Sequence, residues 1–474
     1  MPATTRASVC FTVAMFLQKG LLSISTPIFT RLMSTVEYEE YSVYYAWSTM
    51  LTIVATLNLS SGVLNNQLVK GKHRTEIIVS SMEGVSSLWA FGFALISCCL
   101  FILGFRFNSM PIFLWVFMLF SFMFTPAYEL WAVSKRFVYE YREPCIVMVI
   151  VALLTFIFPL IGVLISPDHS KGDAKIFATI AVNFVVGIIF WFSNLYRGKY
   201  LFVKSIWKEA IIFNLPLIPH FLSLSILNQS DKIMIQYLGE PGQAGIYSVA
   251  HTIAAMIQLL MTAINYSLVP WTYQNLKAGN CRTIAERTNT ILYSVSIVLA
   301  CTMLFAPEIM WIMAPDAYHE AIYIIPPMAA GIFFSYLYQL YGRIELYHEK
   351  TKGMMFGSIG CAAVNLILNY IFISLFGYMA AAYTTLFCNI CLCLMHWILV
   401  GRLVHKLNYK EIPYDSRVSF TASIAVLLVA LLMPILYMHT TLRWNVILCI
   451  CIIAIINRRK IYKIMFSISK KQGS

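Results

Sequence analysis

Lysine side chains stand inside two long apolar stretches of this sequence. The stretch FTVAMFLQKGLLSISTPIFT at positions 11–30 carries Lys19, and the stretch SILNQSDKIMIQ carries Lys232 next to Asp231. A charge at the centre of a membrane-length helix costs at least ~2.5 kcal/mol, so such residues usually face a hydrated interior. Amines in these places suit an anionic ligand.

Further polar residues share a helix face with each lysine. At helical spacing the first group falls within an arc of about 60°. It comprises Thr12, Lys19, Ser23, Thr26 and Thr30. The second group comprises Ser225, Gln229, Lys232 and Gln236. We therefore expect each of these two helices to turn one wet face toward a shared cavity.

Two other apolar stretches carry polar stripes, and titratable residues occur nearby. One stripe comprises His251, Gln258, Thr262 and Asn265, and the other Ser121, Thr125 and Glu129. We interpret Lys19, Lys232, Ser23, Thr26, Gln229, His251, Gln258 and Asn265 as lining a substrate cavity. Asp231, Glu129 and His220 are candidates for carrying a coupling proton or sodium ion; no other cofactor and no metal site is expected.

Structural explanations compete with these roles. Lys19 and Lys232 could form buried ion pairs that only hold helices together, with Glu129 or Asp231 as partners. His220 and His251 could be hydrogen-bonded packing residues. Motifs of enzymes are missing from the sequence: it has no Asp-x-Asp pair, no glycine-rich phosphate loop, no His-Glu-x-x-His and no Gly-x-Ser-x-Gly. We therefore expect a binding or transport protein and not an enzyme.

The elements that must position these residues are membrane helices. Hydrophobic residues make up 59% of the 474 residues and charged residues only 12%, which is typical of an integral membrane protein. Apolar stretches long enough to cross a bilayer recur throughout the chain. They predict an all-α polytopic membrane protein with about fourteen transmembrane helices.

Basic residues predict the orientation of these helices. The net charge of +13 could suggest nucleic acid, but with a cytoplasmic N-terminus 27 of the 34 Lys and Arg residues fall on the cytoplasmic side. That asymmetry obeys the positive-inside rule and places both termini in the cytoplasm. We accordingly expect a lipid bilayer and no nucleic acid as partner.

An internal repeat predicts the domain organisation. RLMSTVEYEEYSVYYAW follows the first helix and MIQYLGEPGQAGIYSVAHTI the seventh, with Tyr41-Ser42-Val43 matching Tyr247-Ser248-Val249. An even number of intervening spans gives both copies the same orientation, hence two six-helix bundles related by an axis along the membrane normal. The predicted parts are a bundle at 1–194, a cytoplasmic linker at 195–209, a bundle at 210–402, and two helices with a basic tail at 403–474. A capping box at Ser34 and Glu37 predicts the start of the second helix.

Several segments resemble a known family. TPIFTRLMSTVEYEEYSVYYAW, LNLSSGVLNNQLVKGKHR, NQSDKIMIQYLGEPGQAGIYSVAHTIA and INYSLVPWTYQNL are similar to the polysaccharide-transporter branch of the multidrug/oligosaccharidyl-lipid/polysaccharide exporter (MOP) superfamily, and most of all to Wzx-type O-antigen flippases. The resemblance implies a MATE-like fold of two lobes around a central cavity. It implies passage of an undecaprenyl-diphosphate-linked oligosaccharide across the bacterial cytoplasmic membrane by alternating access. Lys19 and Lys232 are the positions that suit contact with the diphosphate.

Two rival functions remain at the level of the sequence. A multidrug or metabolite antiporter of the same superfamily would prefer carboxylates to lysines in its cavity. A membrane-embedded glycan polymerase or ligase would need long outer loops, and the predicted outer loops are short. A polymerase and a chain-length regulator of polysaccharide assembly are possible protein partners of a flippase.

Overall fold

The computed structural model describes residues 3–70, 72–103, 110–138, 140–409 and 411–456, and every regular element within them is a helix. The first half contains α1 (Ala3–Leu32), α2 (Thr35–Ala55), η1 (Leu59–Ser61), α3 (Val63–Lys70), α4 (Thr75–Ile102), α5 (Ile112–Ser121), α6 (Pro126–Phe137), α7 (Arg142–Ile165) and α8 (Lys171–Gly198). The second half contains α9 (Lys204–Asn214), η2 (Leu215–Leu217), α10 (Ile218–Leu238), α11 (Gln243–Ala278), α12 (Cys281–Leu304), α13 (Ala306–Met313), η3 (Asp316–Tyr323), α14 (Ile325–Tyr347), α15 (Thr351–Phe376), α16 (Ala380–Lys406), α17 (Ser416–Met438) and α18 (Thr440–Ile456).

The helices have the length and apolarity of membrane spans. Within the described residues ten helical segments could cross a bilayer, or eleven if the bent η3–α14 pair counts as one span. In two of these segments a break divides the helix, between α5 and α6 and at η2 between α9 and α10. The predicted all-α, multi-span membrane fold is confirmed. The predicted count of fourteen spans is not established by this criterion.

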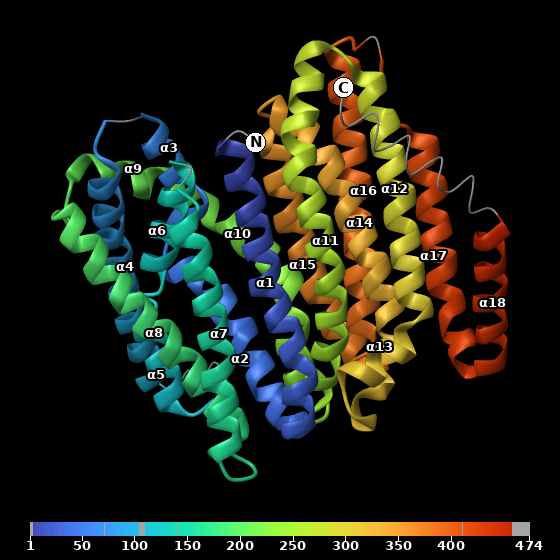
Figure 1. The fold of residues 1–474 in the computed structure, drawn as a ribbon, viewed down its shortest axis with the longest axis horizontal. Coiled ribbons are helices and arrows are strands. Elements are labelled where there is room, and N and C mark those ends of the chain that lie inside the picture. Colours follow the sequence, from blue (N-terminus) through green and yellow to red (C-terminus); the bar gives the residue numbers. More distant parts are fainter. Residues whose placement is uncertain (1–2, 71, 104–109, 139, 410, 457–474) are drawn as a thin grey trace.

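The helices form two groups that lie side by side (Figure 1). We call α1–α8 the N-lobe and α10–α16 the C-lobe; α17 and α18 flank the C-lobe. The lobes meet where α2 packs against α10 and α11 and where α1 packs against α11. The start of α1 and the end of α18 lie toward the same end of the molecule, as an even number of crossings requires. The domain boundaries at 194, 209 and 402 stay predictions.

At the end where α1 turns into α2, the two copies of the repeat pack against each other. The predicted capping box is present, with Ser34 and Glu37 bonded reciprocally at the start of α2. The Glu39 carboxylate, 5% exposed, accepts hydrogen bonds from the backbone amides of Gly242 (2.8 Å) and Ala244 (2.9 Å) at the start of α11. A helix N-terminus favours such an anion. A Cβ on Gly245 would lie 2.4 Å from the Thr35 carbonyl oxygen, so the backbones are in close contact there. We call this contact the α2–α11 seam.

At the opposite end, the segment after α8 is fixed to α4. The Ser80 hydroxyl donates to the Tyr200 carbonyl (2.9 Å), and the Val203 amide donates to the Ser81 hydroxyl (3.1 Å). A Cβ on Gly84 would lie 2.1 Å from the Leu201 carbonyl oxygen, so only glycine permits this approach. The segment that joins the lobes is therefore part of the N-lobe packing.

The end of α9 is held by the N-lobe as well. Asn214 is 1% exposed, and its Nδ2 donates to the carbonyls of Leu57 (2.8 Å) and Asn58 (3.0 Å). Its Oδ1 accepts from the Val63 amide (3.1 Å) at the start of α3. These bonds pair the backbone groups of a turn where Leu57 and Asn58 have positive φ. The end of α9 is therefore anchored to the N-lobe by hydrogen bonds.

Candidate functional site

A buried carboxylate lies at the centre of the C-lobe. Asp231 on α10 is 4% exposed and accepts hydrogen bonds from three other helices. Its donors are the Tyr247 hydroxyl on α11 (2.5 Å), Asn369 Nδ2 on α15 (2.7 Å) and the Thr385 hydroxyl on α16 (2.9 Å). Three donors of this kind compensate much of the cost of burying a carboxylate. The pattern fixes Asp231 at the meeting point of four helices.

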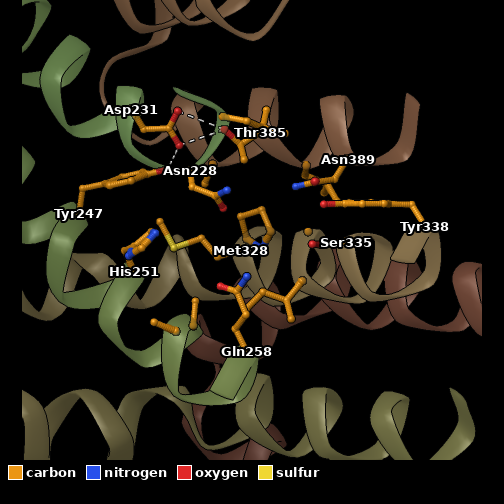
Figure 2. Close-up of a pocket in the computed structure, with 18 of the residues that line it drawn as sticks. Asn228, Asp231, Tyr247, His251, Gln258, Met328, Ser335, Tyr338, Thr385 and Asn389 are labelled. Carbon is orange, nitrogen blue, oxygen red and sulfur yellow. Dashed lines mark hydrogen bonds between the residues drawn. The ribbon is translucent and has the colours of Figure 1, made fainter. Parts of the chain in front are cut away.

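Asp231 borders a cavity of about 100 Å³ in the C-lobe, which Figure 2 shows. His251 and Gln258, both on α11, point into it from the side opposite Asn389. Other polar wall residues are Asn228, Ser335, Tyr338 and Gln339. No group of three or more His, Cys, Asp or Glu in the described residues could hold a metal ion. We call this space the C-lobe cavity.

Lys232 faces a different direction from its neighbour Asp231, because successive helical residues point about 100° apart. It is 5% exposed, its ammonium donates to Gln229 Oε1 (3.1 Å), and it lies 6.0 Å from the ring centroid of Tyr45 on α2. Among the described residues no carboxylate forms an ion pair with it. Lys232 is thus a buried amine at the contact between the lobes.

A second cavity, of about 320 Å³, lies inside the N-lobe; we call it the N-lobe cavity. Glu129 on α6 is exposed to it and accepts a hydrogen bond from the Ser60 hydroxyl (3.0 Å). The predicted stripe of Ser121, Thr125 and Glu129 does line one space, although the helix breaks between α5 and α6. The break lies against α8 at Gly187, where a Cβ would lie 2.7 Å from the Phe124 backbone.

The remaining predicted site residues lie elsewhere. Lys19 is part of α1, but its side chain is outside the described residues. Ser23 and Thr26 are buried on α1 and line neither cavity. His220 contacts the Ser358 hydroxyl (2.9 Å), as a packing residue would. Asn265 binds Gln339 (2.9 Å) and Arg343 on α14. The C-lobe cavity therefore unites only Asp231, His251 and Gln258 of the predicted set.

Sequence reasoning missed several residues of these sites. Asn369 and Thr385 belong to helices that carried no predicted site residue; the i, i+4 pair Asn365 and Asn369 was the available signal. A buried pair, His396 Nδ1 and Glu345 Oε1 at 2.7 Å, joins α16 to α14.

Lys175, counted among the outer basic residues, is 4% exposed on α8. Its ammonium lies over the rings of Phe29 (3.8 Å) and Tyr41 (3.7 Å). Such cation–π contacts stabilise an amine that lacks an anionic partner.

Comparisons with known proteins agree with this architecture. The family model described as polysaccharide biosynthesis protein matches residues 5–276, and the MatE model matches residues 216–371. The Lsg locus putative protein 1 of Haemophilus influenzae is 26% identical over 151 residues, which are 30% of this chain and 36% of that protein. The chain thus spans about a third of the length of that curated relative.

Solved structures share the fold. The lipid II flippase MurJ in an inward closed conformation superposes with a TM-score of 0.67 at 15% identity, over 92% of this chain and 100% of MurJ. A MOP superfamily transporter from Pyrococcus furiosus has a TM-score of 0.60 at 14% identity, over 86% and 96% of the two chains. At such identities the likeness establishes the fold alone. With a family model matched over more than half of its length, the chain belongs to the polysaccharide biosynthesis protein family and has the fold of MOP-superfamily transporters.

Proposed function

We propose that this chain is a flippase that carries an undecaprenyl-diphosphate-linked oligosaccharide from the inner to the outer leaflet of the bacterial cytoplasmic membrane. The cargo is an O-antigen unit or another repeat unit of a surface polysaccharide, and the lobes move it by alternating access. Family membership and the MurJ-like fold support this reading. In the orientation predicted from the basic residues, both termini are cytoplasmic. A polymerase and a chain-length regulator would act on the delivered product.

The observation that carries the proposal is the burial of the Lys232 ammonium and the identity of its neighbours. It is a buried amine at the contact between the lobes, with an amide and an aromatic ring as neighbours and no carboxylate partner among the described residues. A charge there is costly unless an anion joins it. A diphosphate supplies that anion, and Lys19 is the second amine that we assign to it.

Asp231 is the residue that we assign to ion coupling, if the cycle uses a proton or sodium gradient. Its carboxylate is buried and borders the C-lobe cavity, so it can exchange an ion with that space. Glu129 faces the other cavity, and His220 is hydrogen-bonded to Ser358. These two are the weaker candidates.

A strain that lacks the protein provides the test. It should accumulate complete lipid-linked repeat units on the cytoplasmic side of the membrane. Lys232→Ala should fail to restore glycan display, with transport reduced about 10- to 100-fold, the usual worth of a charge-assisted contact. Lys277→Ala, which removes an exposed lysine of α11, should restore display fully. Normal display with Lys232→Ala would contradict the assignment.

A multidrug antiporter is the second candidate, since the MatE model matches residues 216–371 and a carboxylate borders the C-lobe cavity. A cationic drug would pair with Asp231. The same strain separates the candidates, because an antiporter predicts greater drug sensitivity and no accumulation of lipid-linked glycan.

A further inference from the structure

Hydroxyl groups from several helices line the N-lobe cavity. Its polar wall residues are Gln18, Tyr41, Tyr44, Tyr45, Ser48, Thr52, Thr56, Ser60, Ser121, Thr125, Tyr128, Glu129, Thr155, Thr179 and Asn183. They come from α1, α2, η1, α5, α6, α7 and α8 and from the turns that follow α2 and α5. Elsewhere in the lobe apolar residues such as Leu114, Met118 and Leu119 fill the helix contacts, whereas hydroxyl groups are concentrated around this cavity.

Many of these hydroxyls already donate their hydrogen bond to a backbone carbonyl of their own helix. Thr52 donates to the Ser48 carbonyl (2.6 Å), Thr155 to the Val151 carbonyl (2.9 Å) and Thr179 to the Lys175 carbonyl (2.7 Å). Thr56 and Ser121 bond within their own helices in the same way. A hydroxyl that donates to its own helix keeps its oxygen lone pairs as acceptors. The wall therefore favours a ligand that brings many hydrogen-bond donors.

The charge of the wall narrows the ligand class. Among the described side chains that line the N-lobe cavity, Glu129 is the only charged one, and it adds two acceptor oxygens. A phosphate or a uronic acid would be repelled here, whereas the hydroxyls of a neutral sugar would be bound. Tyrosine rings supply apolar faces next to polar tips, which suits the amphipathic faces of sugar rings.

Tyr45 connects this cavity to the amine of the C-lobe. Its ring lines the N-lobe cavity and also lies 6.0 Å from the Lys232 ammonium. A diphosphate held at Lys232 would thus have its first sugar at Tyr45. The N-lobe cavity, at about 320 Å³ against 100 Å³ for the C-lobe cavity, also offers more room for a glycan.

We propose that the N-lobe cavity is the glycan subsite of this transporter and that it selects neutral, hydroxyl-rich sugars. Tyr45 marks the boundary between the diphosphate at Lys232 and the sugars in the N-lobe. This assignment rests on the proposed flippase function and gives it a substrate class. It leaves the C-lobe cavity and Asp231 for the coupling ion.

The test uses the full chain in proteoliposomes with two probes. One is undecaprenyl diphosphate that carries a single N-acetylglucosamine, and the other carries a neutral pentasaccharide. Thr52→Val/Thr155→Val removes two acceptors of the cavity wall and should slow transport of the pentasaccharide lipid about tenfold, as expected for two lost hydrogen bonds. Transport of the monosaccharide lipid should stay close to that of the wild type.

Thr302→Val is the matched control, because Thr302 bonds to its own helix in the same way but is half-buried on α12, away from the cavity. It should change neither rate. Equal slowing of both lipids in the double variant, or none, would overturn the subsite while the flippase function stands. A wild-type protein that transports neither lipid would overturn the flippase function and the subsite with it.

A second variant reverses the charge of the wall. Glu129→Lys should transport a pentasaccharide lipid that contains a uronic acid faster than the neutral one, the reverse of the wild-type preference. A misfolded variant loses both activities and cannot produce this reversal. An unchanged preference in active Glu129→Lys protein would contradict the selection of neutral sugars.

Discussion

At the scale of single residues, Asp231 and Lys232 are neighbours on one helix but face different parts of the molecule. The carboxylate turns into the C-lobe and has donors from three helices, whereas the amine turns toward α2. Because they point in different directions, these two side chains do not form an ion pair with each other. Each can respond to a different ligand.

Asp231→Asn should uncouple transport from its driving gradient. An amide keeps the size of the carboxylate but can neither take up a proton nor attract a sodium ion, so the transport rate under a gradient should fall to the rate without one. Proteoliposomes with imposed proton or sodium gradients provide the measurement. Tyr247→Phe keeps the carboxylate and removes one donor, and it should retain gradient stimulation. An Asp231→Asn protein whose transport is still fully stimulated by the gradient would exclude a role of Asp231 in ion coupling.

The sequence predicted part of these sites. A charged residue in an apolar helix is energetically costly and therefore indicates a functional site, which is why Asp231, Lys232 and Glu129 could be predicted. Asn369 and Thr385 are uncharged and lie far along the chain from Asp231, and only tertiary packing brings them together. Lys175 is a basic residue near a helix end, so nothing in its local sequence indicated that aromatic rings would enclose it.

At the scale of helices, the α2–α11 seam depends on the Glu39 carboxylate. Glu39→Gln removes the charge that the α11 N-terminus attracts. This should destabilise the α2–α11 seam by about 1–2 kcal/mol and lower the ratio of closed-seam to open-seam molecules about 5- to 30-fold. Distances between spin labels at the starts of α2 and α11, measured in a cysteine-free background, should lengthen. Glu40→Gln is the control, since Glu40 lies against Gly172 of α8 instead. An unchanged distance distribution in Glu39→Gln would contradict the role.

Helices were more predictable than their interruptions. The reciprocal Ser34–Glu37 cap confirms the predicted start of α2, because a capping box is a local signal. The break between α5 and α6 was not predicted from its apolar sequence. It depends on Gly187 of another helix, which lets the broken backbone approach α8. Contacts between distant segments decide such features.

At the scale of the whole molecule, the distribution of basic residues predicts how the chain lies in the membrane. Alkaline phosphatase, which is active only outside the cytoplasm, should be inactive when fused after residue 474 and active when fused after residue 168, between α7 and α8. The reason is that the predicted spans put 27 of 34 basic residues on the side of the termini. Activity of the fusion at residue 474 would contradict the even number of crossings.

The fixed position of the segment after α8 has a consequence for the motion of the lobes. Residues 199–203 are bonded to α4, and Asn214 binds the turn after α2, so this segment and the end of α9 move with the N-lobe. The pivot must then lie beyond Asn214. There η2, which contains Pro216, interrupts the helix, and Pro219 follows in the first turn of α10. The amide donors that these prolines lack leave the backbone easier to bend. Rocking would thus originate within a membrane span, and the linker would serve as an anchor.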